Sequence, residues 1–254
     1  MSLILRLARK LDTLAQYIAR PNLFVLRRRG VTLDIYRKLD TPWLRGYNFA
    51  TVLDVGANIG QFALAAHEVW PEARIYSFEP LPDCYEQMLV RLERVKAFAG
   101  FNVGLGGERG SLTFERSSFS PSSSFRKMAS THKTEFPFTR ECERVSVKVE
   151  RLDDVAAGLK LENPILLKID VQGFEDQVLR GGEAMLRRVE MIVVESSFEV
   201  LYEGQPLFDD IYRGLTERGF IYKGALDQSL SPNDGRPLQA DSIFVKRQGV
   251  VNAP

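Results

Sequence analysis

The residues with the clearest chemical pattern lie in the stretch LDVGANIGQFA, where an apolar run ends in Asp54 and a glycine-containing turn leads into a helical pattern. Turns of this kind bind nucleotide-type cofactors, because backbone N–H groups at the start of the helix face the ligand. The dinucleotide fingerprint Gly-x-Gly-x-x-Gly needs its middle glycine so that the backbone can approach a pyrophosphate. Here Gly56 is followed by Asn58 in the middle position and by Gln61 in the last. The pattern favours S-adenosylmethionine, which has no phosphate, over NAD.

A second chemical signal is Glu79, which follows a strand-like run in the stretch SFEP. A carboxylate at this position has two acceptor oxygens for the two hydroxyl groups of a ribose. NAD sites use a carboxylate in the same way, so Glu79 alone does not identify the cofactor. Together with the glycine turn, it favours the methyl donor.

A third group of polar residues follows two later strands. Asp170 ends the strand in KIDVQG, Glu175 begins the next helix, and Glu195 ends the strand in VVESSF. Because open α/β sheets bind ligands at the carboxyl ends of their strands, we expect these carboxylates to converge on one crevice. Side chains alternate along a strand, so Lys168 should face the same side as Asp170. The alternative for Asp170 is that it only caps the following helix.

The elements that must position these residues alternate between strands and helices. Apolar patterns predict strands at 51–55, 74–78, 97–105, 164–169 and 191–198, and helices at 61–70, 84–95, 174–189 and 207–218. Strands separated by helices imply right-handed crossovers and a parallel sheet, so the fold class is α/β. The runs at 220–226 and 241–247 have no helix between them, which predicts a final hairpin and an antiparallel last strand.

Residues 104–150 interrupt this alternation. The runs at 110–116 and 143–152 alternate like antiparallel strands, and a Ser-rich loop lies between them. Long loops inside compact domains are often lids, but this one is equally well interpreted as an exposed linker. His132 in the loop is a weak candidate for contact with a substrate, whereas His67 is expected on the surface of the first helix.

The amino-terminal segment is the most basic part of the chain. Residues 1–38 carry nine Lys and Arg against two Asp, a net charge of +7 in a protein whose total is +1. Apolar residues at helical spacing predict a helix over 2–19 that stops at Pro21, followed by a second short helical pattern to about Leu44. Three roles fit: packing on the following domain, pairing in a homodimer, or contact with an anionic membrane surface. We favour packing, because the segment directly precedes the first strand and is too short to fold alone.

Composition excludes several other classes of protein. The two cysteines, Cys84 and Cys142, lie far apart, which excludes a disulfide scaffold or a zinc ribbon. Two histidines cannot build a histidine-rich metal site. The sequence has no run of 18 apolar residues and no signal peptide pattern, so we expect a cytoplasmic protein.

Seven stretches of the chain resemble the FkbM family of S-adenosylmethionine-dependent methyltransferases, and they occur in the family's order. They are VLDVGANIGQFA, SFEP, FNVGLGGERGSLTF, VERLDDV, LLKIDVQGFEDQVLRGG, VVESSFEVLYEG and DSIFV. The resemblance implies a Rossmann-like class I methyltransferase fold, with a mostly parallel seven-stranded sheet and an antiparallel last strand. It also implies methyl transfer to a hydroxyl oxygen of a sugar, glycan or polyketide-like small molecule. The methyltransferase domain would span 51–247, after a helical extension at 1–50 and before a tail at 248–254.

The resemblance also assigns roles by position. Around the methionine part of S-adenosylmethionine we expect Asp54, Gly56, Asn58, Gly60 and Gln61. Glu79 should hold the ribose, and Asn102 lies where the adenine end is usually contacted, although it could equally be a turn residue. Methyl transfer to a hydroxyl needs a base to take the proton, either a carboxylate with a raised pKa or a lysine with a lowered one. The candidates are Asp170, Glu175, Glu195 and Lys168, and Asp170 is also expected to contact the cofactor. The carboxylates could also hold a divalent ion, but nothing in the sequence requires it, and we predict no metal site.

Other functions are less well supported. Nucleic-acid methyltransferases that act on exocyclic amines often carry an N/D-P-P-Y/F turn after the fourth strand, where this chain has DVQG. The basic residues are also concentrated at the amino terminus, so no nucleic-acid partner is predicted. Asn58 argues against a dinucleotide-dependent oxidoreductase. A non-catalytic cofactor-binding module remains as the alternative from a different class.

Overall fold

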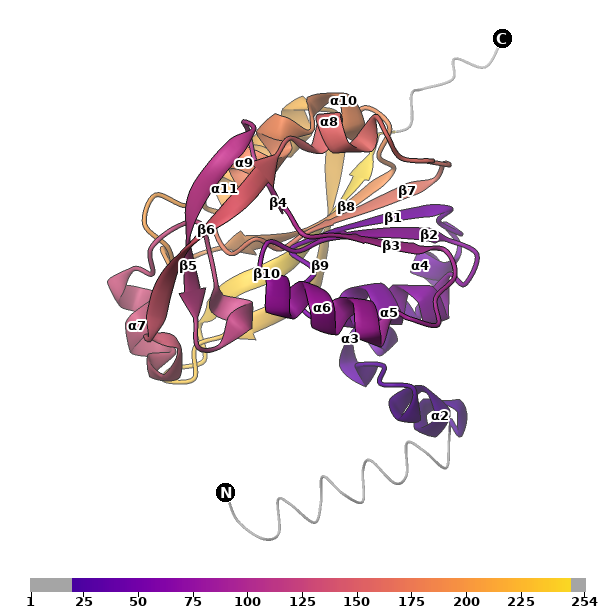
Figure 1. The fold of residues 1–254 in the computed structure, drawn as a ribbon, viewed down its shortest axis with the longest axis horizontal. Helices are drawn as coiled ribbons and strands as arrows, with labels where there is room; N and C mark the ends of the chain where they lie inside the picture. Colours follow the sequence, from indigo (N-terminus) through magenta and orange to yellow (C-terminus); the bar gives the residue numbers. More distant parts are fainter. Residues whose placement is uncertain (1–19, 248–254) are drawn as a thin grey trace, which may run out of the picture.

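In the computed structural model, which describes residues 20–247, seven strands form one sheet in the order β3-β2-β1-β7-β8-β10-β9 (Figure 1). Strand β10 runs antiparallel to both of its neighbours, and every other pair is parallel. The predicted α/β fold with an antiparallel final hairpin is therefore confirmed. The strands are β1 Thr51–Val55, β2 Arg74–Phe78, β3 Phe98–Phe101, β7 Ile165–Ile169, β8 Met191–Ser197, β9 Phe220–Leu230 and β10 Pro237–Lys246.

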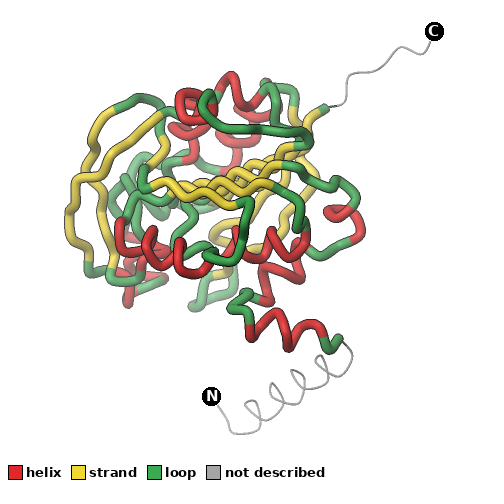
Figure 2. Tube along the Cα trace, turned by 45° about the vertical axis from the view of Figure 1, so that its right-hand side comes forward, coloured by secondary structure: helices red, strands yellow, loops and turns green. Residues whose placement is uncertain are grey.

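Helices cover both faces of this sheet (Figures 1 and 2). Helices α5 (Gln61–Val69) and α6 (Pro82–Arg91) lie on one side. Four helices lie on the other: α8 Leu152–Ala156, α9 Glu175–Gly181, α10 Glu183–Leu186 and α11 Phe208–Glu217. Successive residues of β1 point to opposite faces, so Val52 joins the hydrophobic cluster beneath α5 while Leu53 joins the cluster on the other side.

The single helix predicted over 174–189 is wrong, because the segment forms the two helices α9 and α10. The break follows Gly181, whose missing side chain lets the loop after β4 approach closely: a Cβ there would lie 2.0 Å from the carbonyl oxygen of Gly106. The second helix then begins afresh, with the Asp153 carboxylate accepting the backbone N–H groups of Ala184 and Met185. Gly106, which approaches Gly181, and Asp153, which binds the start of α10, both belong to segments that are distant in the sequence.

The interrupting region at 104–150 forms a second, three-stranded sheet in the order β4-β6-β5. Its strands are β4 Gly104–Leu105, β5 Gly110–Ser117 and β6 Cys142–Glu150, and β5 pairs antiparallel with β6 as predicted. The strand predicted over 97–105 is divided between the two sheets. The segment between β5 and β6, which we call the Ser-rich segment (118–141), contains short helices at Ser120–Ser122 (η1), Ser130–Glu135 (α7) and Pro137–Thr139 (η2).

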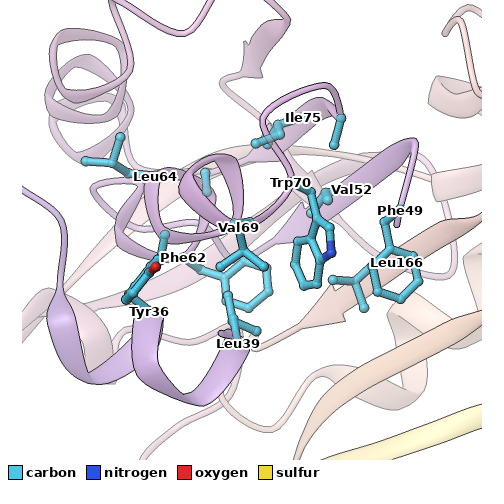
Figure 3. Packing of buried hydrophobic residues seen from close by; sticks show 14 of the residues in the cluster. Tyr36, Leu39, Phe49, Val52, Phe62, Leu64, Val69, Trp70, Ile75 and Leu166 are labelled. Atoms are coloured by element: carbon cyan, nitrogen blue, oxygen red, sulfur yellow. The ribbon is translucent and has the colours of Figure 1, made fainter. Parts of the chain in front are cut away.

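Within the described residues, three short helices precede the sheet: α2 Asn22–Arg28, α3 Leu33–Leu39 and α4 Pro42–Arg45. The helix predicted over 2–19 lies outside the described residues, and Pro21 precedes a helix instead of only ending one. Figure 3 shows Tyr36 and Leu39 of α3 beside Phe62 and Val69 of α5, in one hydrophobic cluster.

The described part of the amino-terminal segment thus packs on the sheet domain, and the dimer and membrane roles remain predictions. Among residues 20–247, no helix is long and apolar enough to cross a membrane.

The turns after β1 and β7 meet because these strands are parallel neighbours, with Val55 opposite Ile169. Gly56 has φ +76°, and a Cβ added to it would lie 1.8 Å from the carbonyl oxygen of Asp170. A glycine is required at this point both by the backbone conformation and by the close approach.

We predict that Gly56→Ala lowers the free energy of unfolding by about 3 kcal/mol or more, from a left-handed alanine and a backbone clash together. Gly219→Ala is the matched control, because Gly219 has φ +83° but no atom within 4 Å of an added Cβ. Gly219→Ala should lower the free energy of unfolding only by the cost of holding an alanine in the left-handed conformation, about 1–2 kcal/mol. Urea unfolding of both variants measures the difference. An equal decrease in the free energy of unfolding in both variants would contradict the prediction, because the turns after β1 and β7 would then separate without cost.

Candidate active site

A cavity of about 310 Å³ lies at the carboxyl ends of the parallel strands, where ligand sites are found in open α/β sheets. Its walls come from the turn after β1, from Glu79 after β2, from the turn after β7, and from Glu195 in β8. The Ser-rich segment, α3 and the β9–β10 hairpin complete it. The polar residues that line it are Lys38, Asn58, Gln61, Glu79, Ser120, Ser123, Lys168, Asp170, Gln172, Glu195 and Asp241.

Lys168 stands between two carboxylates at the base of this cavity. Its Nζ lies 3.5 Å from Asp54 Oδ1 and 3.3 Å from Asp170 Oδ2, and it donates a hydrogen bond to the carbonyl of Gly56 at 3.1 Å. As predicted, Lys168 and Asp170 face the same side. Burial alone would lower the pKa of Lys168, but the charges of Asp170 and Asp54 outweigh it and hold the pKa above its ordinary value. The ammonium group stays protonated, so this lysine is no candidate for the base.

Asp54 and Gly60 shape the turn after β1 from behind the cavity wall and do not line it. Asp54 is completely buried, and burial raises its pKa. Asn58 has φ +49° and faces the cavity, where its Nδ2 donates to Ser120 Oγ at 3.1 Å. Of the residues expected around the methionine part of the cofactor, Gly56, Asn58 and Gln61 line the cavity directly.

Glu79 connects two turns at the cavity wall. Its Oε2 accepts the backbone N–H of Asn58 at 2.8 Å, and its Oε1 accepts that of Leu81 at 2.9 Å. The side chain is buried, and burial raises its pKa to about 7, although the two N–H groups oppose the rise. Each carboxylate oxygen has a second lone pair, so Glu79 can still accept hydroxyl groups from a ligand.

Asn102 lies outside the cavity wall. Its Nδ2 donates to the carbonyl oxygens of Glu79 and Pro80, at 2.9 and 3.1 Å. In the described structure it therefore braces the segment that carries Glu79.

The three predicted carboxylates do not share one environment. Asp170 and Glu195 both line the cavity and receive hydrogen bonds from the same residue, Gln172, at 2.8 and 2.6 Å. Glu175 lies outside the lining, where its Oε1 accepts the N–H groups of Val171 and Gly173. Burial raises the pKa of Glu175 to about 7. Its contacts fix the turn after β7.

Several cavity residues were missed by sequence reasoning. The sequence does carry a signal for Gln172, because this residue comes two positions after Asp170 in the turn DVQG. Asp241 and Lys38 had none, since they come from β10 and α3. Asp241 is the register partner of Glu195, and burial raises its pKa to about 6. Lys38 forms an ion pair with Asp227 of β9.

His132 does not line the cavity. It is buried against Phe136 and Tyr202, and burial lowers its pKa to about 4. Within the part of the chain that the structure describes, no group of three or more His, Cys, Asp or Glu residues could hold a metal ion.

Comparison with known proteins adds independent information. Residues 54–222 match the family model described as the methyltransferase FkbM domain. The chain is 30% identical over 161 residues to the 2-O-methyltransferase NoeI of Sinorhizobium fredii, covering 61% of this chain and 66% of NoeI. It is 27% identical over 143 residues to the hexuronic acid methyltransferase AglP of Haloferax volcanii, covering 56% of this chain and 54% of AglP. The chain thus spans between about half and two thirds of these relatives.

A crystal structure of the methyltransferase FkbM from Methylobacillus flagellatus has a similar fold. The TM-score is 0.51 at 13% identity, over 82% of this chain and 47% of that chain. At this identity the likeness concerns the fold alone, and it agrees with the predicted class I methyltransferase fold.

We predict that Glu79→Gln weakens binding of S-adenosylhomocysteine at least about tenfold, or roughly 1.4 kcal/mol. An amide oxygen can replace only one of the two carboxylate oxygens, so one of the N–H groups of Asn58 and Leu81 loses its acceptor. The unfolding temperature should fall for the same reason. Calorimetry measures affinity, and Glu86→Gln, at an exposed position on α6, is the control. Unchanged affinity in Glu79→Gln would remove this residue from the cofactor site.

Proposed function

Because this chain belongs to the FkbM methyltransferase family, we propose that it transfers the methyl group of S-adenosylmethionine to a hydroxyl oxygen of a small molecule or glycan. The observation that carries the proposal is the charge of the strand-end cavity. Four carboxylates line it, those of Glu79, Asp170, Glu195 and Asp241, against Lys168 and Lys38. Among the described residues that line it, both lysines are already paired with carboxylates, so a pyrophosphate would find no free cation there, whereas the carboxylates suit a sulfonium cation.

The cofactor end of the cavity is formed by the turn after β1 and by Glu79. The side-chain amides of Asn58 and Gln61 suit the amino-acid part of S-adenosylmethionine, and the lone pairs of Glu79 suit its ribose. Holding the methyl group, the sulfur and the acceptor oxygen in line supplies much of the rate acceleration.

We assign the base to Glu195 by comparing the contacts of the four candidates. Lys168 is protonated, Asp170 is paired with Lys168, and Glu175 is bound to backbone N–H groups. Among the described residues, the Glu195 carboxylate receives a hydrogen bond only from Gln172 and contacts no cation. Burial and the charge of Asp170 raise the pKa of Glu195 well above its ordinary value. A carboxylate whose pKa is raised is a stronger base than an ordinary one, which suits acceptance of a hydroxyl proton.

In the proposed methyl transfer, one bond to the methyl carbon forms as another breaks. The acceptor oxygen forms a bond to the methyl carbon as the bond from that carbon to sulfur breaks. The hydroxyl proton passes to Glu195, and S-adenosylhomocysteine leaves as a neutral thioether.

The acceptor end is completed by segments outside the matched residues 54–222. Helix α3 contributes Ile35 and Lys38, and the β9–β10 hairpin contributes Leu226 and Asp241. Apolar and acidic groups together suit a compound that has both a hydrocarbon face and hydroxyl groups. The name of NoeI supports an oxygen acceptor and that of AglP a sugar-derived compound, and we extend the oxygen acceptor to the present chain.

We predict that Glu195→Gln lowers the turnover number by about 10²–10⁴, the usual contribution of a positioned base, while binding of S-adenosylhomocysteine stays unchanged. The assay incubates purified protein with cell extract and methyl-deuterated S-adenosylmethionine, and mass spectrometry detects the labelled product. Glu203→Gln, on the exposed surface, is the control. Full activity in Glu195→Gln would exclude Glu195 as the base, and absence of any labelled product with the wild-type protein would count against the function.

A further inference from the structure

The turn after β7 holds a glutamine in a backbone conformation that glutamine rarely adopts. Gln172 has φ +53°, and the other non-glycine residues with positive φ among those described are Asn48 and Asn58. Asparagine visits this region readily, whereas a longer side chain does so at a cost. Such a conformation persists only where surrounding contacts enforce it. The contacts that hold Gln172 in this conformation therefore indicate the role of its side chain.

The Gln172 amide bridges two of the carboxylates that line the cavity, those of Asp170 and Glu195. Its Nε2 donates to Asp170 Oδ1 at 2.8 Å and to Glu195 Oε2 at 2.6 Å. A primary amide nitrogen has two N–H groups, so each carboxylate receives one. One side chain thereby fixes the distance between the two carboxylates and their relative orientation.

The orientation of this amide is fixed in turn by its oxygen. Tyr202 Oη lies 2.9 Å from Gln172 Oε1 and 3.1 Å from the carbonyl oxygen of Ser122. Ser124 Oγ donates to the backbone carbonyl of Gln172 at 2.6 Å. With its oxygen beside the phenol and its backbone held by the Ser-rich segment, the amide presents its N–H groups to the carboxylates.

We propose that Gln172 is a positioning residue for methyl transfer, which holds the Glu195 carboxylate ionised and in a single orientation beside the acceptor hydroxyl. The proposal rests on the proposed function, in which Glu195 takes the hydroxyl proton. Gln172 itself exchanges no proton.

The electrostatic surroundings explain why such a residue is needed. Burial and the negative charges of Asp170, Asp241 and Glu175 raise the pKa of Glu195, and the charge of Lys168 opposes them. The nearby phenol of Tyr202 is buried and neutral, since its own pKa is raised. An N–H donor stabilises the ionised carboxylate, so its removal should raise the pKa of Glu195 further. The base would then be protonated over more of the neutral pH range.

Two variants test this proposal. Gln172→Met keeps a side chain of similar length without hydrogen-bonding groups. Gln172→Gly also removes the amide, but it relieves the left-handed backbone, so a fault in the turn cannot explain its effect. The readout is the pKa of Glu195, measured by carbon-13 NMR of glutamate-labelled protein, with the resonance assigned by its loss in Glu195→Gln. Both variants should raise this pKa by about one unit or more.

Gln177→Met is the matched control, because Gln177 on α9 hydrogen-bonds Asp176 and does not line the cavity. It should leave the pKa of Glu195 unchanged. An unchanged pKa in both Gln172 variants, or an equal shift in the control, would overturn the proposal. In methyl transfer, kcat/KM should fall at neutral pH and recover at higher pH, with unchanged affinity for S-adenosylhomocysteine. Because the NMR readout needs no activity, a wild-type protein that transfers no methyl group would defeat the proposed function and leave the hydrogen-bonding effect of Gln172 separately measurable.

Discussion

One buried ammonium group, that of Lys168, forms ion pairs with two carboxylates at the point where β1 and β7 end side by side. Removing one partner from a buried charge cluster typically costs about 3–5 kcal/mol, because the remaining charge stays buried without compensation. The hydrogen bond from Lys168 to Gly56 fixes the turn after β1, and its ion pair with Asp170 fixes the turn after β7, the two turns on which the proposed site is built. Among the described residues, Lys168 forms ion pairs with Asp54 and Asp170 but not with Glu195, and Glu195 is the carboxylate that we propose as the base.

The parts of the site that follow from local rules could be predicted from the sequence. Strand alternation and the glycine turn indicate a parallel sheet, and the carboxyl ends of its strands bring Glu79, Asp170 and Glu195 to one edge. The period of two along β7 correctly places Lys168 beside Asp170. These inferences need only neighbours in the chain and the direction of each strand.

The remaining parts depend on contacts between distant segments, for which the chain carries no local signal. Asp241 reaches the cavity through its register opposite Glu195, which pairing between β8 and β10 determines. Gln172 acts through a left-handed backbone that an ordinary glutamine would not suggest. Asn102 follows a strand, as a cofactor contact would, yet its amide is used by the carbonyl groups of a neighbouring turn. The helix break after Gly181 likewise depends on a backbone from another loop.

We propose the strand-end cavity as a site for S-adenosylmethionine, and calorimetry can decide whether it binds there. Titration of the purified protein with S-adenosylhomocysteine and, separately, with NAD compares a neutral thioether with an anionic pyrophosphate at the same acidic cavity. We predict that one S-adenosylhomocysteine binds per chain and that NAD gives no heat of binding. Tight binding of NAD without a response to S-adenosylhomocysteine would contradict it.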